Sequence, residues 1–240
     1  MSNDLTSAPF TLPFSAPGLG LENAGGKGAN LARLAKAGYP VPGGFVVKTA
    51  AYRAFVANNS LEEAINQTLT AHRLNELDEL ESASAEIRER FAAGAIPSEI
   101  AEEVLRAYRS LGSPPAAVRS SATAEDLPDL SFAGQQDTFL NIVNEAALLK
   151  AVVACWSSLW TGRAIGYRIR QGIPQQGLAL AVLVQQMVQS EVSGVMFTAN
   201  PLTGLRSQVV IDASFGLGEA LVSGQVEPDH YVVDTIGGSI

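Results

Sequence analysis

The feature that most limits the possible folds is the separation of helical patterns from strand-like patterns along the chain. Residues 61–112 are rich in Glu and Ala with apolar residues at helical spacing, whereas 178–188, 192–198 and 208–213 are β-branched or alternating. A doubly wound fold needs strands and helices in regular alternation, so this order argues against it. The sequence therefore predicts an α+β fold with mostly antiparallel sheets, in which 61–112 forms a helical insert and 116–240 a strand-rich lobe.

Capping and turn residues place the other elements. Helices are expected at 29–37, 49–57 and 144–170, the last capped by Asn144, and short strands at 45–47, 116–120, 138–143 and 231–234. The last of these strands leads into a turn at 235–238, which opens a hairpin whose second strand is missing. We therefore expect residues 1–240 to be one domain that is incomplete at its C-terminus.

Charge and cysteine content exclude several classes of partner. The net charge of −8 argues against binding to nucleic acid or anionic lipid, and no apolar run reaches the roughly 18 residues of a membrane helix. A single cysteine, Cys155, rules out an intrachain disulfide and suits the cytoplasm. Because Cys155 lies among apolar residues of a predicted helix, it is expected to be buried and not a nucleophile.

A glycine-rich segment with one lysine, Gly25-Gly26-Lys27-Gly28, precedes the helix expected at 29–37. Glycines let backbone N–H groups approach an anion, a helix amino end favours negative charge, and the lysine adds a full positive charge. The segment is not a Walker A loop, because Gly28 follows the lysine where Ser or Thr is required. Two interpretations stay open: a phosphate site that uses Lys27, and a flexible turn with a solvated lysine.

Arg119 stands at the end of a predicted strand, before the hydroxyl-bearing Ser120 and Ser121. A guanidinium there can bind phosphate oxygens with paired hydrogen bonds, and the hydroxyls can act as secondary donors. The alternative is a structural arginine paired with Glu125 or Asp126.

Other polar or glycine-containing segments carry weaker signals. Residues 132–138 could fold over a ligand or form a plain turn. The pair Gly216 and Gly218 does not complete a dinucleotide fingerprint, since Leu221 occupies the third glycine position. Neither His72 nor His230 has ligands at metal-binding spacing, so no metal site built from protein side chains is expected.

Taken together, these segments resemble the nucleotide-binding domain of the phosphoenolpyruvate synthase and pyruvate phosphate dikinase family over residues 18–234. The resemblance rests on six segments in the family's order: GGKGANLARLAKAGYPVPGGFVV, VRSSATAED, FAGQQDTFLN, CWSSLWTGRAIGYR, VLVQQMVQSEVSGVMFTANP and IDASFGLGEALVSG. The GKGANL and DASFGLGEALVSG versions look most similar to those of rifampicin phosphotransferases.

The resemblance implies an ATP-grasp-like fold of two α+β lobes. It also implies an enzyme that splits ATP to AMP and phosphate and passes the β-phosphoryl group to a histidine on a downstream domain. That histidine would then phosphorylate pyruvate or a drug hydroxyl on an acceptor-substrate domain. ATP and Mg²⁺ are the implied cofactors, with Mg²⁺ held mostly by ATP phosphates and water.

Motif by motif, the resemblance assigns roles to individual residues. Lys27 and Arg119 would hold the phosphates and act in catalysis. Gly134 and Thr138 would line the phosphate loop, with Gln135 nearby. The hinge beside adenine would be formed by Gln185 and the backbone of Gln186, Met187 and Val188, and Glu219 would lie near the ribose or metal. Further family ligands would lie beyond Ile240, so this chain by itself is not expected to complete the reaction.

Two alternatives to a catalytic domain stay open. The chain could be a truncated or stand-alone nucleotide-binding module without catalytic activity. It could also be a purely structural α+β domain, in which the segment around Lys27 is only a turn.

Overall fold

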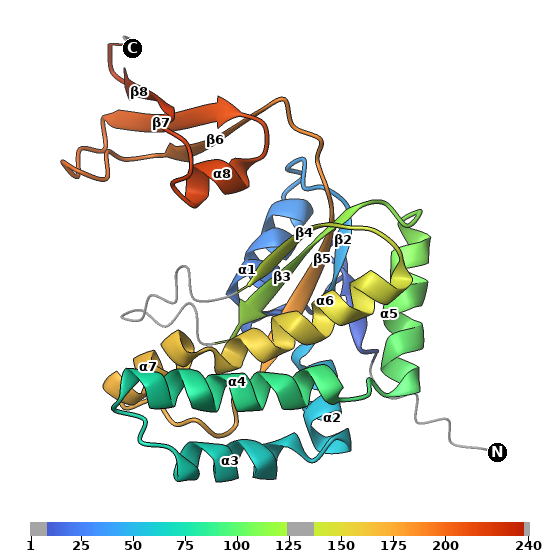
Figure 1. The fold of residues 1–240 in the computed structure, drawn as a ribbon. Coiled ribbons are helices and arrows are strands. Elements are labelled where there is room, and N and C mark those ends of the chain that lie inside the picture. Colours follow the sequence, from blue (N-terminus) through green and yellow to red (C-terminus); the bar gives the residue numbers. More distant parts are fainter. Residues whose placement is uncertain (1–8, 124–136, 238–240) are drawn as a thin grey trace. The chain divides into compact units, whose positions relative to one another are not determined.

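The computed structural model describes residues 9–123 and 137–237, and these divide into two compact units at Met187. Both units contain antiparallel sheets and helices, so the α+β prediction is confirmed (Figure 1). The strands within 116–187 pair with strands near the N-terminus instead of with those after residue 188. The boundary between compact units therefore lies later in the chain than the change in composition near residue 116.

The first unit is built on a five-stranded antiparallel sheet in the order β1-β2-β5-β3-β4. The strands are β1 (Thr11–Pro13), β2 (Gly44–Val47), β3 (Ala116–Ala122), β4 (Thr138–Ile142) and β5 (Leu180–Gln186). β5 is central because it pairs with both β2 and β3. Its buried, nearly unbroken apolar sequence suits a strand covered on both faces.

One face of this sheet carries the main core and most of the helices. These are α2 (Thr49–Asn58), α3 (Leu61–Ala71), α4 (Leu77–Ala93), α5 (Ser98–Ser110), α6 (Glu145–Ser157) and α7 (Gly162–Arg170). Val118 and Val182 of the strands pack there with Phe55, Ile87 and Trp156 of the helices. The helical segment α3–α5 thus contributes directly to the core of the first unit.

The opposite face is covered by α1 (Leu21–Lys36), which lies across the sheet from α6 (Figure 1). A smaller apolar cluster joins Ala24 of α1 to Val46 and Leu183 of the sheet, with Leu31 packed against it. α1 therefore starts earlier than the predicted helix at 29–37 and includes the glycine-rich segment.

The single helix predicted from Asn144 to Arg170 is wrong, because the chain forms two helices there. Asn144 caps α6 as predicted, since its side chain accepts a hydrogen bond of 2.9 Å from the Ala147 N–H. A short 3-10 turn, η1 (Ser158–Trp160), then ends the helix, and Thr161 caps α7 through the Ala164 N–H. Thr161 is a residue type that often caps the start of a helix, but the apolar spacing continued through it and suggested one uninterrupted helix.

Buried aromatic residues tie α2 to this region. The hydroxyl of Tyr52 accepts a 3.0 Å hydrogen bond from Nε1 of Trp160, and both side chains are almost fully buried. Burial raises the pKa of the Tyr52 phenol above its usual value. The native structure therefore favours the neutral phenol.

Replacing Tyr52→Phe is expected to lower the free energy of unfolding by about 1–3 kcal/mol, because the buried Trp160 Nε1 loses its acceptor. In the wild type, the raised pKa contributes stability that is complete below about pH 10 and is lost as the pH rises toward the folded-state pKa. Denaturant unfolding at about pH 8 and about pH 11 should show a steeper loss for wild type than for Tyr52→Phe. Tyr39→Phe, at a side chain that is 63% exposed, is the control. If the free energy of unfolding depends on pH equally in wild type and Tyr52→Phe, the pKa of the Tyr52 phenol is not raised by folding.

The second unit holds a three-stranded antiparallel sheet in the order β6-β7-β8. Its elements are β6 (Val192–Phe197), β7 (Gln208–Phe215), β8 (Asp229–Asp234) and the short helix α8 (Gly218–Val222). The loop between β6 and β7 is held by Asn200, whose Oδ1 accepts from the N–H groups of Leu202 and Thr203. Among the helices described in either unit, none has the length and apolar character needed to cross a membrane.

Candidate functional site

Three of the predicted site residues share one face of the first unit's sheet. Arg119 of β3 is the register partner of both Leu183 in β5 and Thr138 in β4. Paired residues of antiparallel strands point to the same face, and residues two apart on a strand do so as well. Since Leu183 packs under α1, the side chains of Arg119, Thr138 and Gln185 all belong to the face that α1 covers.

α1 changes direction within the glycine-rich segment. Gly25 has φ +67° and ψ 177°, which interrupts the helical conformation inside α1. A Cβ added at Gly25 would lie 2.2 Å from the carbonyl oxygen of Ser121. Gly25 is therefore required both for its backbone conformation and for the close approach of α1 to β3. The half-buried Lys27 follows this kink directly.

Ser121 joins α1 to β3 at the kink. Its Oγ donates to the carbonyl oxygen of Ala24 at 2.7 Å and accepts from the N–H of Gly28 at 3.1 Å. The residue is fully buried. The prediction that Ser121 offers a secondary phosphate donor does not fit this geometry, because its only hydroxyl proton is bonded to Ala24.

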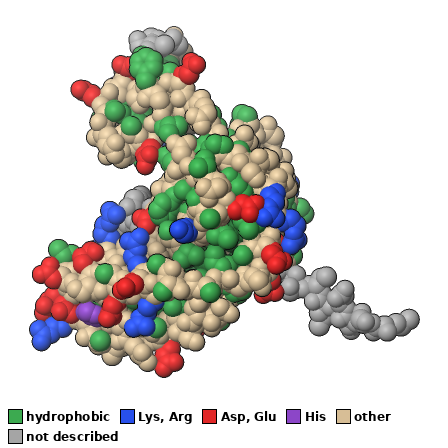
Figure 2. All heavy atoms as spheres, turned by 45° about the vertical axis from the view of Figure 1, so that its right-hand side comes forward, with side chains coloured by type: hydrophobic (Ala, Val, Ile, Leu, Met, Phe, Trp, Pro, Cys, Tyr) green, Lys and Arg blue, Asp and Glu red, His purple; other side chains and the backbone are tan. Residues whose placement is uncertain are grey.

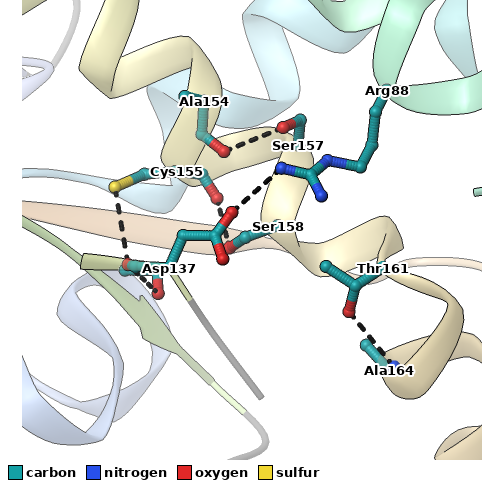
Figure 3. Close-up of polar contacts among 9 residues, drawn as sticks. Arg88, Asp137, Ala154, Cys155, Ser157, Ser158, Thr161 and Ala164 are labelled. Carbon is teal, nitrogen blue, oxygen red and sulfur yellow. Dashed lines mark hydrogen bonds and ion pairs between the residues drawn. The ribbon is translucent and has the colours of Figure 1, made fainter. Parts of the chain in front are cut away.

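Ser120 also has a structural role, on the opposite face of β3. Its N–H and Oγ both approach the carbonyl oxygen of Asp137, at 3.4 Å and 3.2 Å. Figure 3 shows Arg88 of α4 reaching the Asp137 carboxylate, at 3.0 Å, and the Cys155 thiol directed at the Asp137 carbonyl. Asp137 immediately precedes Thr138, so these contacts fix the start of β4 and with it the position of Thr138.

The charge of Lys27 acts on the buried thiol of Cys155 in α6. Burial raises the pKa of the Cys155 thiol, the carboxylate of Asp137 raises it further, and the ammonium of Lys27 opposes the rise. Cys155 is completely buried, as predicted, and a thiol held neutral in this way is a poor nucleophile.

Arg119 is partly exposed on the same face. In the described parts of the chain, no hydrogen bond or ion pair joins its guanidinium to another residue. The alternative partners Glu125 and Asp126 lie outside the described residues. Lys27 and Arg119 therefore provide two positive charges on one side of the sheet, close to a glycine-containing turn.

The predicted adenine hinge lies at the end of β5. Gln185 is buried and its Nε2 donates to the carbonyl oxygen of Pro42 at 3.4 Å. The N–H groups of Gln186 and Met187 donate to the carbonyl oxygens of Gly43 and Pro115, at 2.8 Å and 2.9 Å. Both N–H groups already donate hydrogen bonds within the protein, so an adenine base at this strand end would have to form its hydrogen bonds with other backbone groups.

The remaining predicted residues lie elsewhere. Gly134 and Gln135 fall outside the described residues. Val188 and Glu219 belong to the second unit, and both are exposed. Within the described structure, Arg119, Thr138 and Gln185 thus share the sheet face that α1 covers, and Lys27 lies on α1 itself.

Carboxylates accompany both histidines, which their spacing in the sequence did not reveal. Acidic side chains gather around a histidine on the helical surface in Figure 2, and His72 contacts Glu79 at 2.8 Å and Glu86 at 3.7 Å. The hydrogen bond from His72 lowers the pKa of Glu79. His230 pairs with Asp212 at 2.6 Å. Over the described ranges, no group of three or more His, Cys, Asp or Glu side chains could hold a metal ion.

Comparison with known proteins gives a consistent set of matches. The family model described as pyruvate phosphate dikinase, AMP/ATP-binding domain, matches residues 21–240. A probable phosphoenolpyruvate synthase of Staphylothermus marinus is 46% identical over 218 residues, covering 88% of this chain and 26% of that protein. A rifampicin phosphotransferase of Streptomyces sviceus is 48% identical over 211 residues, covering 87% of this chain and 24% of that protein. A phosphoenolpyruvate synthase of Aeropyrum pernix is 44% identical over 219 residues, covering 87% of this chain and 26% of that protein. The chain spans about a quarter of the length of these relatives.

Proposed function

Because the chain belongs to the family of pyruvate phosphate dikinase AMP/ATP-binding domains, we propose that its first unit binds the phosphates of ATP where α1 meets β3. Lys27 and Arg119 bind the phosphate oxygens, and Thr138 adds a hydroxyl from the neighbouring strand. The observation that carries the proposal is the placement of Arg119 on the sheet face covered by α1, next to the kink that holds Lys27.

The two cations suit phosphoryl chemistry. As negative charge shifts between phosphate oxygens, fixed positive charges stabilise it without needing to reorganise. The space left by the missing side chains of Gly25 and Gly28 is used within the protein, because a Cβ at Gly25 would meet Ser121 and one at Gly28 would meet Ala24 and Leu183. In this proposal Mg²⁺ accompanies ATP and is held mostly by the ATP phosphates and by water.

The finer parts of the proposal follow from the family. The domain is ATP-grasp-like, with Gln185, Gln186, Met187 and Val188 as the adenine hinge, Gly134 and Gln135 in the phosphate loop, and Glu219 near the ribose or metal. In the whole enzyme, ATP is split to AMP and phosphate, and the β-phosphoryl group passes to a histidine of a separate domain. Pyruvate or a drug hydroxyl is the final acceptor, in keeping with the two kinds of relative.

Binding without catalysis is the second candidate for this chain. It is favoured by one observation: the matched region covers only 24–26% of the three relatives described, so their activity need not reside in it. Both candidates require the same nucleotide site, and the first test therefore concerns binding.

The proposed function is tested by calorimetric titration of the 240-residue chain with Mg-ATP and, separately, with adenosine. Two charge-assisted contacts to phosphate should make ATP bind at least about a hundredfold more tightly than adenosine. A folded chain that binds neither ligand, or binds both equally, would contradict a phosphate site at Lys27 and Arg119. Release of AMP with two phosphates per ATP, with water accepting both phosphoryl groups, would favour catalysis over simple binding.

A further inference from the structure

We propose that Ser121 is a positioning residue, which holds Lys27 in register with the strand that carries Arg119. The proposal rests on the proposed ATP site and assigns to Ser121 a role distinct from contact with the nucleotide.

The hydroxyl of Ser121 is inserted into the hydrogen-bond ladder of α1. In a regular α-helix the N–H of Gly28 would donate to the carbonyl of Ala24, four residues earlier. Here Gly28 donates to Ser121 Oγ at 3.1 Å, and Ser121 Oγ donates to Ala24 at 2.7 Å. A side chain inserted between such partners is a known cause of a helix kink. Lys27 lies within the turn that this hydroxyl holds open.

The kink and the hydroxyl depend on each other. Gly25 adopts φ +67°, which breaks the helix one residue after Ala24 and brings the backbone of α1 against Ser121. Ser121 is fully buried, so water cannot replace its hydroxyl without a rearrangement. Loss of the hydroxyl either leaves the Ala24 carbonyl and the Gly28 N–H without partners or lets them bond directly. In both cases the turn that carries Lys27 moves.

The same strand fixes Arg119. Arg119 and Ser121 are two residues apart on β3 and point to the same face, and their backbone is paired with Leu183 and Ala181 of the central strand β5. Ser121 therefore connects a rigid position in the sheet to a turn that has no sheet pairing of its own. Its effect on ATP binding should operate through Lys27.

A double-mutant cycle tests this role. Mg-ATP dissociation constants are measured by calorimetry for wild type, Ser121→Ala, Lys27→Met and the double variant. We expect Ser121→Ala to weaken binding about tenfold in the wild type and less than about twofold in the Lys27→Met background. Ser158→Ala is the matched control, because Ser158 is also fully buried and its Oγ donates to the backbone carbonyl oxygen of Cys155 at 2.7 Å. The control should lower stability without changing ATP affinity.

Each result decides a different question. No binding by folded wild type overturns the proposed function itself. Binding by wild type that Ser121→Ala leaves unchanged, or weakens equally with and without Lys27, overturns the positioning role, because a general loosening would not depend on Lys27. Equal losses of ATP affinity for Ser121→Ala and Ser158→Ala would overturn it in the same way.

If circular dichroism shows that Ser121→Ala is unfolded, Ser121→Cys replaces it in the cycle, since a thiol retains similar volume with weaker hydrogen bonds.

Discussion

Lys27→Ala is expected to weaken Mg-ATP binding by about 10- to 150-fold, the effect of losing a charge-assisted contact of about 1.5–3 kcal/mol. The reason is that Lys27 follows the kink of α1 on the sheet face that carries Arg119, where phosphate charge would be concentrated. The loss of folding stability should be the smaller effect, about 1 kcal/mol, because the Lys27 side chain is only partly buried.

Calorimetric titration measures the affinity, and circular dichroism verifies the fold. Lys36→Ala is the matched control, since Lys36 is an exposed lysine in the last turn of the same helix. If both variants bind ATP like wild type, the segment around Lys27 is only a turn. If Lys27→Ala is unfolded, the lysine is structural and the proposed role is wrong.

Gly25→Ala is expected to cause the largest loss of stability, about 4 kcal/mol, through two separate effects. The backbone at φ +67° disfavours any residue with a Cβ, and the new Cβ would meet the carbonyl oxygen of Ser121 at 2.2 Å. The neighbouring atom belongs to the backbone of a paired strand, so it cannot move aside easily.

Gly38→Ala separates these effects. Gly38 has φ +81° but open space around its missing Cβ, so only the conformational cost of about 1–2 kcal/mol should appear. Denaturant unfolding followed by tryptophan fluorescence is the measurement, because both tryptophans, Trp156 and Trp160, lie in the first unit. Similar losses of stability in Gly25→Ala and Gly38→Ala would show that α1 does not pack closely against β3 at Ser121.

Local signals in the sequence predicted most elements of the fold. The cap at Asn144, the strand expected at 45–47 and the buried Cys155 were all recognisable from residue type and spacing. The α+β class also followed from the order of helical and strand-like segments. These features depend on neighbours within a few residues, which a sequence displays directly.

The arrangement around Lys27 could not be predicted in the same way. Ser121 contacts Ala24 and Gly28 across 97 and 93 residues, so no local pattern reports the contact. A serine beside an arginine suggested a phosphate donor, whereas its single proton is used inside the protein. The positive φ of Gly25 was likewise hidden, since glycine is equally compatible with a flexible turn and with a fixed kink.

The position of β5 has a consequence for how the protein is made. β5 is the last strand of the first unit to be synthesised, yet it is the one that joins β2 to β3. Until Leu180–Gln186 has left the ribosome, the two halves of the nascent sheet cannot be joined, and both expose strand edges that can pair with other chains. Formation of the Lys27–Arg119 face is thus a late event in biogenesis, and nascent chains that stop short of β5 are the ones most exposed to aggregation.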